Sequence, residues 1–419
     1  MHAVVLAGGS SSRFWPLNTR HKCLLEMQGK TLLRHTLDSL QDAGVDAAVV
    51  VQGPDRDIEE ALDTPAGMDV AFAVQEEPRG MGDALLRARE RVGGRFVVTG
   101  PYRIDAGDLV EQLRAAARGG GAVAGTATDE PSRYGMLDLD EGRATGVVEK
   151  PERGEAPSDH RIVSTYLLEA EFFDILDTVE EHEYSFEDAL DRYMDRREVG
   201  YAELDAEPPS LKYPWDALDI AGLLLSRQEA RIADSAEVAD SAAIEGNVVI
   251  ADDVTVYENA VISGPCYIGE GCTIGTNALV RDGTVLGEGS TVGAGAEVRG
   301  SVIQPGFSMH SGFIGDSVVG RNVAVGAGTV TANRRVRDGQ GGRPEISVHV
   351  PAQERTVATG RDRLGVLVGD DVDIGTQANL MPGVCIGRGT FIGPSAMVRE
   401  NVGEEKRYFT KVDAREMER

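Results

Sequence analysis

The sequence predicts two unlike domains, an α/β domain followed by a parallel β-helix. In roughly the first 225 residues, short apolar runs alternate with segments of helical spacing. From about residue 230, an apolar residue instead recurs at every sixth position. A chain of 419 residues is also too long for one hydrophobic core. We therefore expect an α/β domain at 1–225, a β-helix at 226–403 and a C-terminal tail at 404–419.

The first half begins with the short apolar strand "HAVVLAG", and "KTLLRHTLDSLQDAG" follows with helical spacing. That helix is predicted to end at Gly44, because glycine readily adopts the backbone conformation of a helix C-terminus. The alternation continues through "DAAVVVQG", "DRDIEEALD", "MDVAFAVQ", "GDALLRARERV" and "GRFVVTG". Strands that alternate with helices predict right-handed βαβ units and a mainly parallel sheet.

The six-residue period in the second half is unbroken over twelve positions. These are Ile232, Val238, Ile244, Ile250, Val256, Ile262, Ile268, Ile274, Val280, Leu286, Val292 and Val298, and a second run covers Val368, Ile374, Leu380, Ile386, Ile392 and Val398. Such hexapeptides form a β-helix in which three short strands make one coil, with glycine, asparagine and aspartate at the corners. The period breaks near 303–313 and 334–364, where we expect inserted loops. The second includes the basic, glycine-rich stretch "NRRVRDGQGGRPE" as a long exposed loop.

Composition excludes several classes of function. The net charge of −27 argues against a nucleic-acid-binding or membrane-binding surface. It suits a salt-rich cytoplasm, in which screening removes most of the self-repulsion, so we predict a halophilic protein. No apolar run is long enough to span a bilayer and no signal peptide is evident, which predicts a soluble cytoplasmic protein. The four cysteines lack metal-binding spacing and are predicted to be buried, reduced thiols.

One loop departs from the acidic trend. Residues 1–37 carry five basic side chains against one acidic, Glu26, and "LAGGSSSRFWPLNTRHK" follows the first strand directly. Glycines and serines leave backbone N–H groups free to bind phosphate oxygens, and Arg13 and Lys22 would add positive charge. A tight turn with no ligand would use the same glycines, so the added cations are what favour a phosphate site.

These residues resemble the fingerprint of the sugar-1-phosphate nucleotidyltransferases. The matching positions are Leu6, Ala7, Gly8, Gly9, Arg13, Pro16 and Lys22. Further matches follow in order: "QEEPRGMGDAL" with Gln75 and Gly80, "YGML" with Gly135, and "VVEKP" with Glu149 and Lys150. The resemblance covers nearly the whole chain. It implies a Rossmann-like nucleotidyltransferase domain followed by a left-handed parallel β-helix, assembled as a homotrimer.

The resemblance also implies roles for these residues. The loop of Leu6, Ala7, Gly8, Gly9, Ser10, Ser11 and Ser12 would hold a nucleoside triphosphate, UTP or dTTP. Arg13 would offset charge on the leaving pyrophosphate, and Lys22 would bridge the two reacting phosphates. Gln75 and Gly80 would bind the base, and Gly135, Glu149 and Lys150 the sugar. The partner substrate is a sugar 1-phosphate, and Mg²⁺ is the implied cofactor.

The stretch "HSGFIGDSVVGRNVAVGAGTVTAN" resembles the acetyl-transfer segment of two-domain members of that family. His310 would then be the general base that deprotonates a sugar amine for attack on acetyl-CoA, and Asn333 would bind the sugar phosphate. Two departures stand out here. Phe313 replaces a tyrosine, and two lysines that follow the asparagine have no clear counterpart.

The most serious departures concern the metal. Pro101 and Ser210 stand where the family carries its two metal-binding aspartates, and Mg²⁺ normally takes carboxylate oxygens. Three interpretations remain open. Asp105 or Asp108, with Asp216, replaces the lost ligands; the substrates alone hold the metal; or the domain binds nucleotide without turnover, with the β-helix as trimer scaffold or sole acetyltransferase. Lesser departures from the family pattern stand at Ser11, His21, Met81, Ile162 and Ser164.

Overall fold

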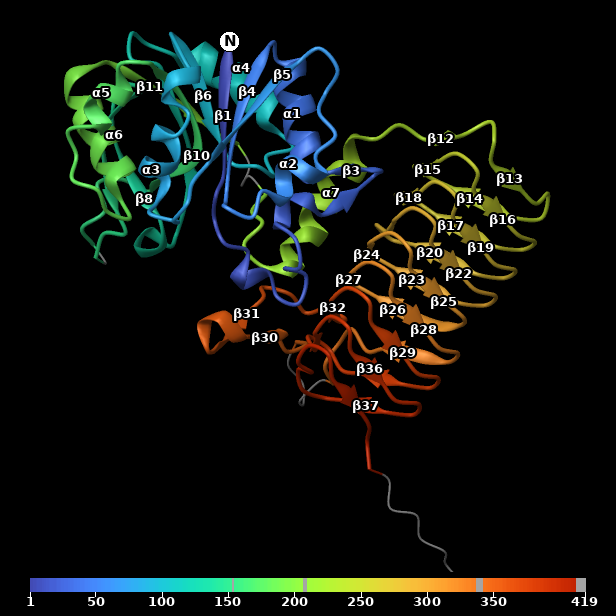
Figure 1. Cartoon of the computed structure of the whole chain (residues 1–419). Coiled ribbons are helices and arrows are strands. Elements are labelled where there is room, and N and C mark those ends of the chain that lie inside the picture. Colours follow the sequence, from blue (N-terminus) through green and yellow to red (C-terminus); the bar gives the residue numbers. More distant parts are fainter. Residues whose placement is uncertain (153, 206–208, 337–341, 412–419) are drawn as a thin grey trace, which may run out of the picture. The chain divides into compact units, whose positions relative to one another are not determined.

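The computed structural model describes residues 1–152, 154–205, 209–336 and 342–411, coloured along the chain in Figure 1. The chain forms two compact units. The first comprises Met1–Ser10 and Thr31–Pro209, and the second comprises Ser11–Lys30 and Ser210–Arg419. The segment 11–30 thus packs with the C-terminal half of the chain, although its neighbours in sequence belong to the first unit. Each unit is described by itself below.

The first unit is built on a nine-stranded sheet in the order β5-β4-β1-β6-β10-β7-β11-β9-β8. Its strands are β1 His2–Ala7, β4 Ala47–Gln52, β5 Asp69–Val74, β6 Arg95–Thr99, β7 Ala122–Ala127, β8 Gly135–Asp140, β9 Arg143–Glu149, β10 His160–Glu169 and β11 Val199–Glu203. Strands β5, β4, β1 and β6 are parallel, as the alternating pattern predicts. The rest is mixed, because β10 runs antiparallel to both β6 and β7, and β8 and β9 form an antiparallel hairpin.

Helices connect the strands of this sheet. They are α1 Leu32–Asp42, α2 Asp57–Ala61, α3 Met81–Leu86, α4 Ala106–Ala116, α5 Phe172–Leu176 and α6 Ser185–Arg196, with the 3-10 turns η3 Arg89–Arg91 and η4 Pro131–Arg133. The predicted helix stop is observed: α1 is followed by Gly44 at φ +72°. Gly107 lets α4 approach α1 closely, since a Cβ there would lie 2.5 Å from the Ser39 carbonyl oxygen. Within the described residues, no helix is long and apolar enough to cross a bilayer.

The second unit contains the left-handed parallel β-helix, whose strands stack into three parallel sheets. The first face holds β12 Arg231–Ile232, β15 Val248–Ile250, β18 Cys266–Ile268, β21 Val285–Leu286, β24 Val302–Ile303, β27 Val318–Val319, β32 Leu367–Val368 and β35 Cys385–Ile386. The second face holds β13 Glu237–Val238, β16 Thr255–Val256, β19 Thr273–Ile274, β22 Thr291–Val292, β25 Ser308–Met309, β28 Ala324–Val325, β33 Asp373–Ile374, β36 Phe391–Ile392 and β38 Arg407–Tyr408. The third face holds β14 Ala243–Glu245, β17 Val261–Ser263, β20 Leu279–Arg281, β23 Glu297–Arg299, β26 Gly312–Gly315, β29 Thr329–Thr331, β34 Asn379–Leu380 and β37 Met397–Val398.

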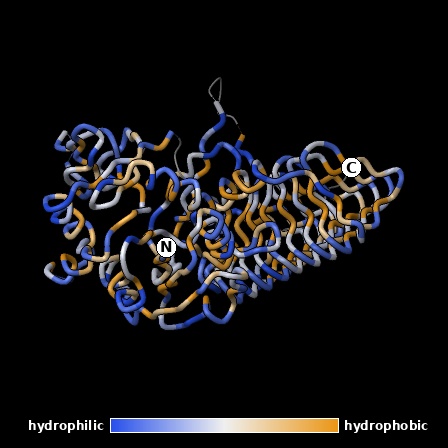
Figure 2. Tube along the Cα trace, turned by 90° about the horizontal axis from the view of Figure 1, so that it is seen from above, coloured by the Kyte–Doolittle hydropathy of each residue, from blue (hydrophilic) through white to orange (hydrophobic). Residues whose placement is uncertain are grey.

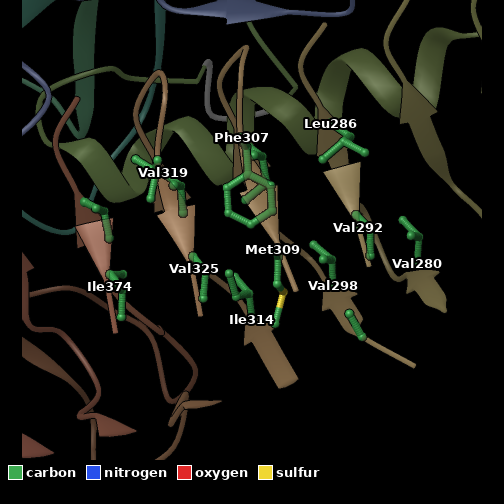
Figure 3. Packing of buried hydrophobic residues seen from close by; sticks show 14 of the residues in the cluster. Val280, Leu286, Val292, Val298, Phe307, Met309, Ile314, Val319, Val325 and Ile374 are labelled. Carbon is green, nitrogen blue, oxygen red and sulfur yellow. The ribbon is translucent and has the colours of Figure 1, made fainter. Parts of the chain in front are cut away.

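Most of the periodic apolar residues fill the interior of the coils, although Ile232 of the first coil is 49% exposed. Ile268 pairs with Leu286, Leu286 with Ile303 and Ile303 with Val319 in successive coils, and each is almost completely buried. Figure 3 shows Leu286, Val319 and other buried side chains of the β-helix packed together, and Figure 2 shows the hydrophobic residues recurring from coil to coil. All four cysteines are buried and free, as predicted.

The two breaks in the period have different structures. Near 303–313 the predicted insertion is wrong, because the coil is shortened there. Val280 pairs with Val298, eighteen residues on, whereas Val298 pairs with Ile314, only sixteen residues on. The second break is a true insertion, since Val319 pairs with Val368. It is not simply a long loop: it contains the hairpin of β30 Ser347–Val350, η6 Pro351–Gln353 and β31 Arg355–Ala358. Residues 337–341 of the expected basic loop lie outside the described residues.

The remaining elements of the second unit precede the β-helix. They are η1 Ser12–Phe14, η2 Lys22–Leu24, β2 Glu26–Met27, which pairs with β3 Lys30–Thr31, then η5 Pro214–Asp216 and α7 Ala217–Arg227. Segment 11–30 is well packed, with Phe14, Cys23, Leu24 and Met27 buried.

Candidate active sites

A pocket of about 800 Å³ lies at the carboxyl end of β1 in the first unit. It is lined by Leu6, Gly8, Gly9, Gln75, Pro78, Arg79, Gly80, Met81, Ala84, Glu181, His182 and Glu183. The structure therefore brings together five of the predicted nucleotide-binding residues, which come from two separate parts of the sequence. Of the others in this unit, Ala7 is buried at the end of β1 and Ser10 is exposed in the following loop.

Gln75 is held in one orientation. Its Nε2 donates hydrogen bonds to the Gly80 carbonyl oxygen at 3.0 Å and to Asp83 Oδ2 at 2.8 Å. Both partners are acceptors, so the amide nitrogen must face them and Oε1 must face the other way. Oε1 points toward Gly8, where an added Cβ would lie only 2.4 Å from it. The pocket thus contains a fixed hydrogen-bond acceptor whose position requires glycine at residue 8.

Sequence reasoning missed Asp83, the carboxylate that orients this amide. Asp83 lies in the first turn of α3, is 7% exposed, and is also paired with Arg87. Its only sequence signal was its place three residues after Gly80. Gly80 itself has φ +104°, and a Cβ there would lie 2.6 Å from the Glu183 carbonyl oxygen, so both conformation and space require glycine.

The two predicted catalytic cations belong to the second unit, as do Ser11 and Ser12. Arg13 is exposed within η1. Lys22 begins η2, where its backbone N–H donates to Ser11 Oγ at 3.0 Å and its Nζ donates to the Leu211 carbonyl oxygen at 2.6 Å. Burial lowers the pKa of Lys22 to about 8. The ammonium group is thus mostly protonated at pH 7 and loses its proton as the pH rises through about 8.

The predicted sugar-binding residues lie together on the β8–β9 hairpin. Gly135 pairs with Glu149, and a Cβ at Gly135 would come within 2.8 Å of Glu149 Oε2. Lys150 Nζ lies 3.2 Å from Glu149 Oε1 and donates to Tyr184 Oη at 3.0 Å.

Glu187 of α6 is a second carboxylate of this region, and no sequence pattern singled it out. Burial raises the pKa of Glu187 to about 7, and the nearby negative charge of Glu149 adds to that rise. This region thus contains two carboxyl groups that interact, Glu149 and Glu187.

The strand end that the family uses for its metal does not fit Mg²⁺ in this chain. Pro101 follows β6, and beyond it the buried Arg103 donates from Nη2 to Asp105 Oδ2 at 2.5 Å and from Nη1 to the Pro209 carbonyl oxygen at 3.4 Å. One oxygen of Asp105 is thus bound to a guanidinium, whose positive charge opposes a nearby cation. Within the described residues, no group of three or more histidine, cysteine or acidic side chains could hold a metal. The role of Asp105 as a ligand remains a prediction; its observed partner is Arg103.

Asp216, the other candidate replacement ligand, forms hydrogen bonds with the local backbone. Its Oδ2 accepts hydrogen bonds from the backbone N–H groups of Lys212 and Tyr213, at 2.6 and 2.8 Å. These bonds stabilise the turn that leads into α7.

A second pocket, of about 600 Å³, lies on the second face of the β-helix. It is lined by Thr291, Gly293, Ala294, Ser308, Met309, His310, Ala324, Val325, Gly326, Asp373, Ile374, Gly375 and Phe391. The predicted base His310 thus lies in a mainly apolar pocket that spans several coils. Gly293 makes room for its backbone, because a Cβ there would lie 2.1 Å from the His310 carbonyl oxygen.

Asn333 is not among the residues that line this pocket. It follows β29 of the third face and donates from Nδ2 to Asp316 Oδ2, which also binds Arg299 Nη1 at 2.7 Å. A single chain therefore does not combine the predicted base and the predicted substrate-binding asparagine in one pocket.

Both halves of the chain match known protein families. Residues 2–208 match the family model described as nucleotidyl transferase, and residues 227–339 match the one described as GMPPB C-terminal domain. The "Bifunctional protein GlmU" of Methanococcus maripaludis is 33% identical, over 98% of both chains. The "Bifunctional sugar-1-phosphate nucleotidylyltransferase/acetyltransferase" of Sulfurisphaera tokodaii is 29% identical, over 96% of this chain and 98% of its own.

A third relative matches the N-terminal half alone. The "UTP--glucose-1-phosphate uridylyltransferase AglF" of Haloferax volcanii is 31% identical, over 52% of this chain and 93% of its own. Residues 2–208 therefore form a domain of the nucleotidyl transferase class. Beyond that class, the full-length matches show that the chain belongs to the family of GlmU-like bifunctional sugar-1-phosphate nucleotidylyltransferases and acetyltransferases.

Proposed function

We propose that this enzyme transfers a nucleotidyl group from UTP or dTTP to a sugar 1-phosphate. An oxygen of the sugar phosphate attacks the α-phosphorus, the bond to the β-phosphate breaks, and pyrophosphate leaves. The observation that supports this choice most directly is the fixed acceptor of Gln75 in the first pocket. Uracil and thymine present an N3–H donor to such an acceptor, whereas adenine and cytosine present a ring nitrogen with no hydrogen.

The proposed mechanism consists of positioning and charge neutralisation, because phosphoryl-type transfer needs little covalent help from the protein. Backbone N–H groups of the loop after β1 bind the triphosphate. Arg13 and Lys22 bind phosphate oxygens, and phosphate would restore the proton of Lys22 by stabilising its charged form. Glu149 accepts hydrogen bonds from sugar hydroxyls. Because the site residues do not fit Mg²⁺, we propose that any metal is held by the substrates alone.

The test is pyrophosphate release from ATP, CTP, GTP, UTP and dTTP, each with a panel of sugar 1-phosphates, in molar KCl. UTP or dTTP should give the highest kcat/KM, with ATP and CTP far lower. A preference for GTP, which also presents a ring N–H donor, would overturn the choice of base. Nucleotide binding without release for any pair would support the alternative of a binding protein that does not turn over.

We further propose that the β-helix acetylates an amino-sugar phosphate with acetyl-CoA, with His310 as the base. The pocket of about 600 Å³ around His310 supports this second activity. Because Asn333 does not line that pocket, we propose a homotrimer in which a neighbouring copy supplies it. The substrates of both reactions are cytoplasmic metabolites, so we place the enzyme there. CoA release with glucosamine or galactosamine 1-phosphate tests the activity, and an unaffected His310→Ala variant would remove His310 as the base.

A further inference from the structure

We propose that the β-helix positions the loop that carries Arg13 and Lys22, with Gln304 and Arg321 as positioning residues for nucleotidyl transfer. This inference rests on the proposed function of that loop. The two residues belong to the C-terminal β-helix, far along the chain from the residues that they hold. Their contacts lie within the second unit, to which the segment 11–30 belongs.

Gln304 contacts the loop through both ends of its amide. Its Oε1 accepts from the Glu26 backbone N–H at 3.0 Å, and its Nε2 donates to the Glu26 carbonyl oxygen at 2.8 Å. The side chain is only 3% exposed. Gln304 thus satisfies both backbone groups of one residue, which a neighbouring β-strand would do in a sheet. Glu26 lies four residues after Lys22.

The position of Gln304 in the repeat indicates that this contact is a specific feature. It directly follows β24 on the first face. The equivalent residues of the other described coils of that face are small: Ala233, Ala251, Gly269, Gly287, Gly320, Gly369 and Gly387. A large buried amide in a column of glycine and alanine is not needed to build the coil. Its observed partner is Glu26.

Two further contacts hold the loop on the next coils of the same face. Arg321, just after β27, binds Glu26 Oε1 through Nη1 at 2.7 Å, with side chains 35% and 26% exposed. Its backbone N–H is fixed by Asp370 Oδ1 at 2.8 Å. Gly369, just after β32, packs directly on the loop, since an added Cβ would lie 2.7 Å from the Pro16 carbonyl oxygen.

These contacts reach the predicted catalytic lysine. A small cavity of about 30 Å³ is lined by Lys22, Leu24, Leu25, Gln304, Arg321 and Asp370, together with Leu17, Arg20 and His21. Lys22 thus shares a cavity wall with both positioning residues. The place and exposure of its ammonium group depend on a loop conformation that the β-helix holds.

The experiment compares three full-length variants with the wild type. Gln304→Gly places at this position the residue found in most equivalent coils, so the β-helix should fold while the contact to Glu26 is lost. Arg321→Ala removes the ion pair, and Arg321→Lys retains the charge. The matched control is Arg388→Ala, which removes an exposed arginine that follows β35 on the same face and pairs with Glu404 and Glu405 of the β-helix.

We expect kcat for nucleotidyl transfer to fall about tenfold or more in Gln304→Gly and Arg321→Ala, with partial rescue in Arg321→Lys. Acetyl transfer and the thermal unfolding midpoint should stay close to wild type. The alkaline limb of the activity profile should move to higher pH, because a loosened loop exposes Lys22 to water and thereby raises its pKa. If the wild type is active and kcat is unchanged in both variants, the proposal is overturned although the proposed function holds.

Limited trypsin digestion keeps the test decisive if the wild type releases no pyrophosphate. Cleavage after Arg20, Lys22 or Lys30 should be several-fold faster in Gln304→Gly and Arg321→Ala than in wild type or Arg388→Ala. If the enzyme shows no turnover, faster cleavage of these variants would still show that the β-helix holds the loop, whereas the proposed function would fail. Equal cleavage in all four proteins would overturn the holding of the loop itself.

Discussion

At the scale of single residues, the first pocket depends on the contact between Gly8 and Gln75. The sequence motif predicted glycine at residue 8 as part of a phosphate-binding turn. The structure adds a separate reason, since the amide of Gln75 occupies the space that a side chain would take. Asp83 fixes that amide but could not be selected in advance, because its role arises from a contact between α3 and the end of β5.

The first prediction follows from this contact. Gly8→Ala should weaken UTP binding. The added Cβ would lie only 2.4 Å from Gln75 Oε1 and would push this acceptor out of its position. Overpacking costs about 1–3 kcal/mol, which corresponds to roughly 5- to 150-fold in Kd. Isothermal titration with UTP measures it. Gly9→Ala is the matched control, because a Cβ there has no neighbour within 4 Å. Equal affinities for the two variants would contradict the contact's role.

The second prediction concerns Lys22, whose pKa burial lowers to about 8 from its ordinary value of 10.5. The kcat/KM for nucleotidyl transfer should fall as pH rises through about 8, because deprotonation removes the charge that binds phosphate. Folding stability should change in the opposite sense. Between pH 8 and 10.5 the unfolded chain binds more protons at this lysine, so its contribution to stability rises with pH.

Steady-state kinetics from pH 6.5 to 9.5 measure the alkaline fall in kcat/KM, and chemical denaturation over the same range measures the free energy of unfolding. Lys22→Arg keeps its charge throughout and should lack the limb, at a lower overall rate, because a guanidinium cannot reproduce the ammonium contact to Leu211. An identical alkaline limb in Lys22→Arg would assign the titration to another group.

At the scale of elements, the six-residue period was sufficient to predict the β-helix, because most of its apolar residues occupy interior positions that permit little else. The period alone could not show how it fails. A shortened coil near 303–313 and an insertion after Val319 both interrupt the pattern, and strand pairings such as Val298 with Ile314 identify the shortened coil. In the first unit, alternation predicted the parallel strands, but β10 lies antiparallel between β6 and β7, an arrangement set by tertiary contacts.

The third prediction belongs to α7, Ala217–Arg227. Gly222 lies exposed in the middle of this helix, and an added Cβ would have no neighbour within 4 Å. Gly222→Ala should therefore stabilise the second unit by about 0.5–1 kcal/mol, because alanine loses less backbone entropy in a helix. Differential scanning calorimetry should show a higher midpoint with unchanged activity. A lower midpoint would mean that this face of α7 is covered in the assembled protein.

At the scale of the whole molecule, the sequence suggested a simple division into an N-terminal and a C-terminal domain. The structure places the segment 11–30 with the C-terminal unit, although its motif belongs to the nucleotidyltransferase fingerprint. No local pattern reveals this, because the deciding contacts, such as Glu26 with Gln304, join residues far apart in sequence. The second unit therefore carries Arg13 and Lys22 as well as the pocket that contains His310.

The last prediction concerns the net charge of −27. Self-repulsion among so many carboxylates opposes the folded state, and salt shortens its range from about 10 Å at 0.1 M to about 3 Å at 1 M. The unfolding midpoint and the activity should both rise steeply as KCl increases from 0.1 to 1 M, and more gradually beyond. Sucrose at matched osmolality is the control, because it acts by exclusion from the surface and leaves charges unscreened. If sucrose were as effective as KCl, or if neither changed the midpoint, charge repulsion would not be what limits stability, and adaptation to a salt-rich cytoplasm would lose its physical basis.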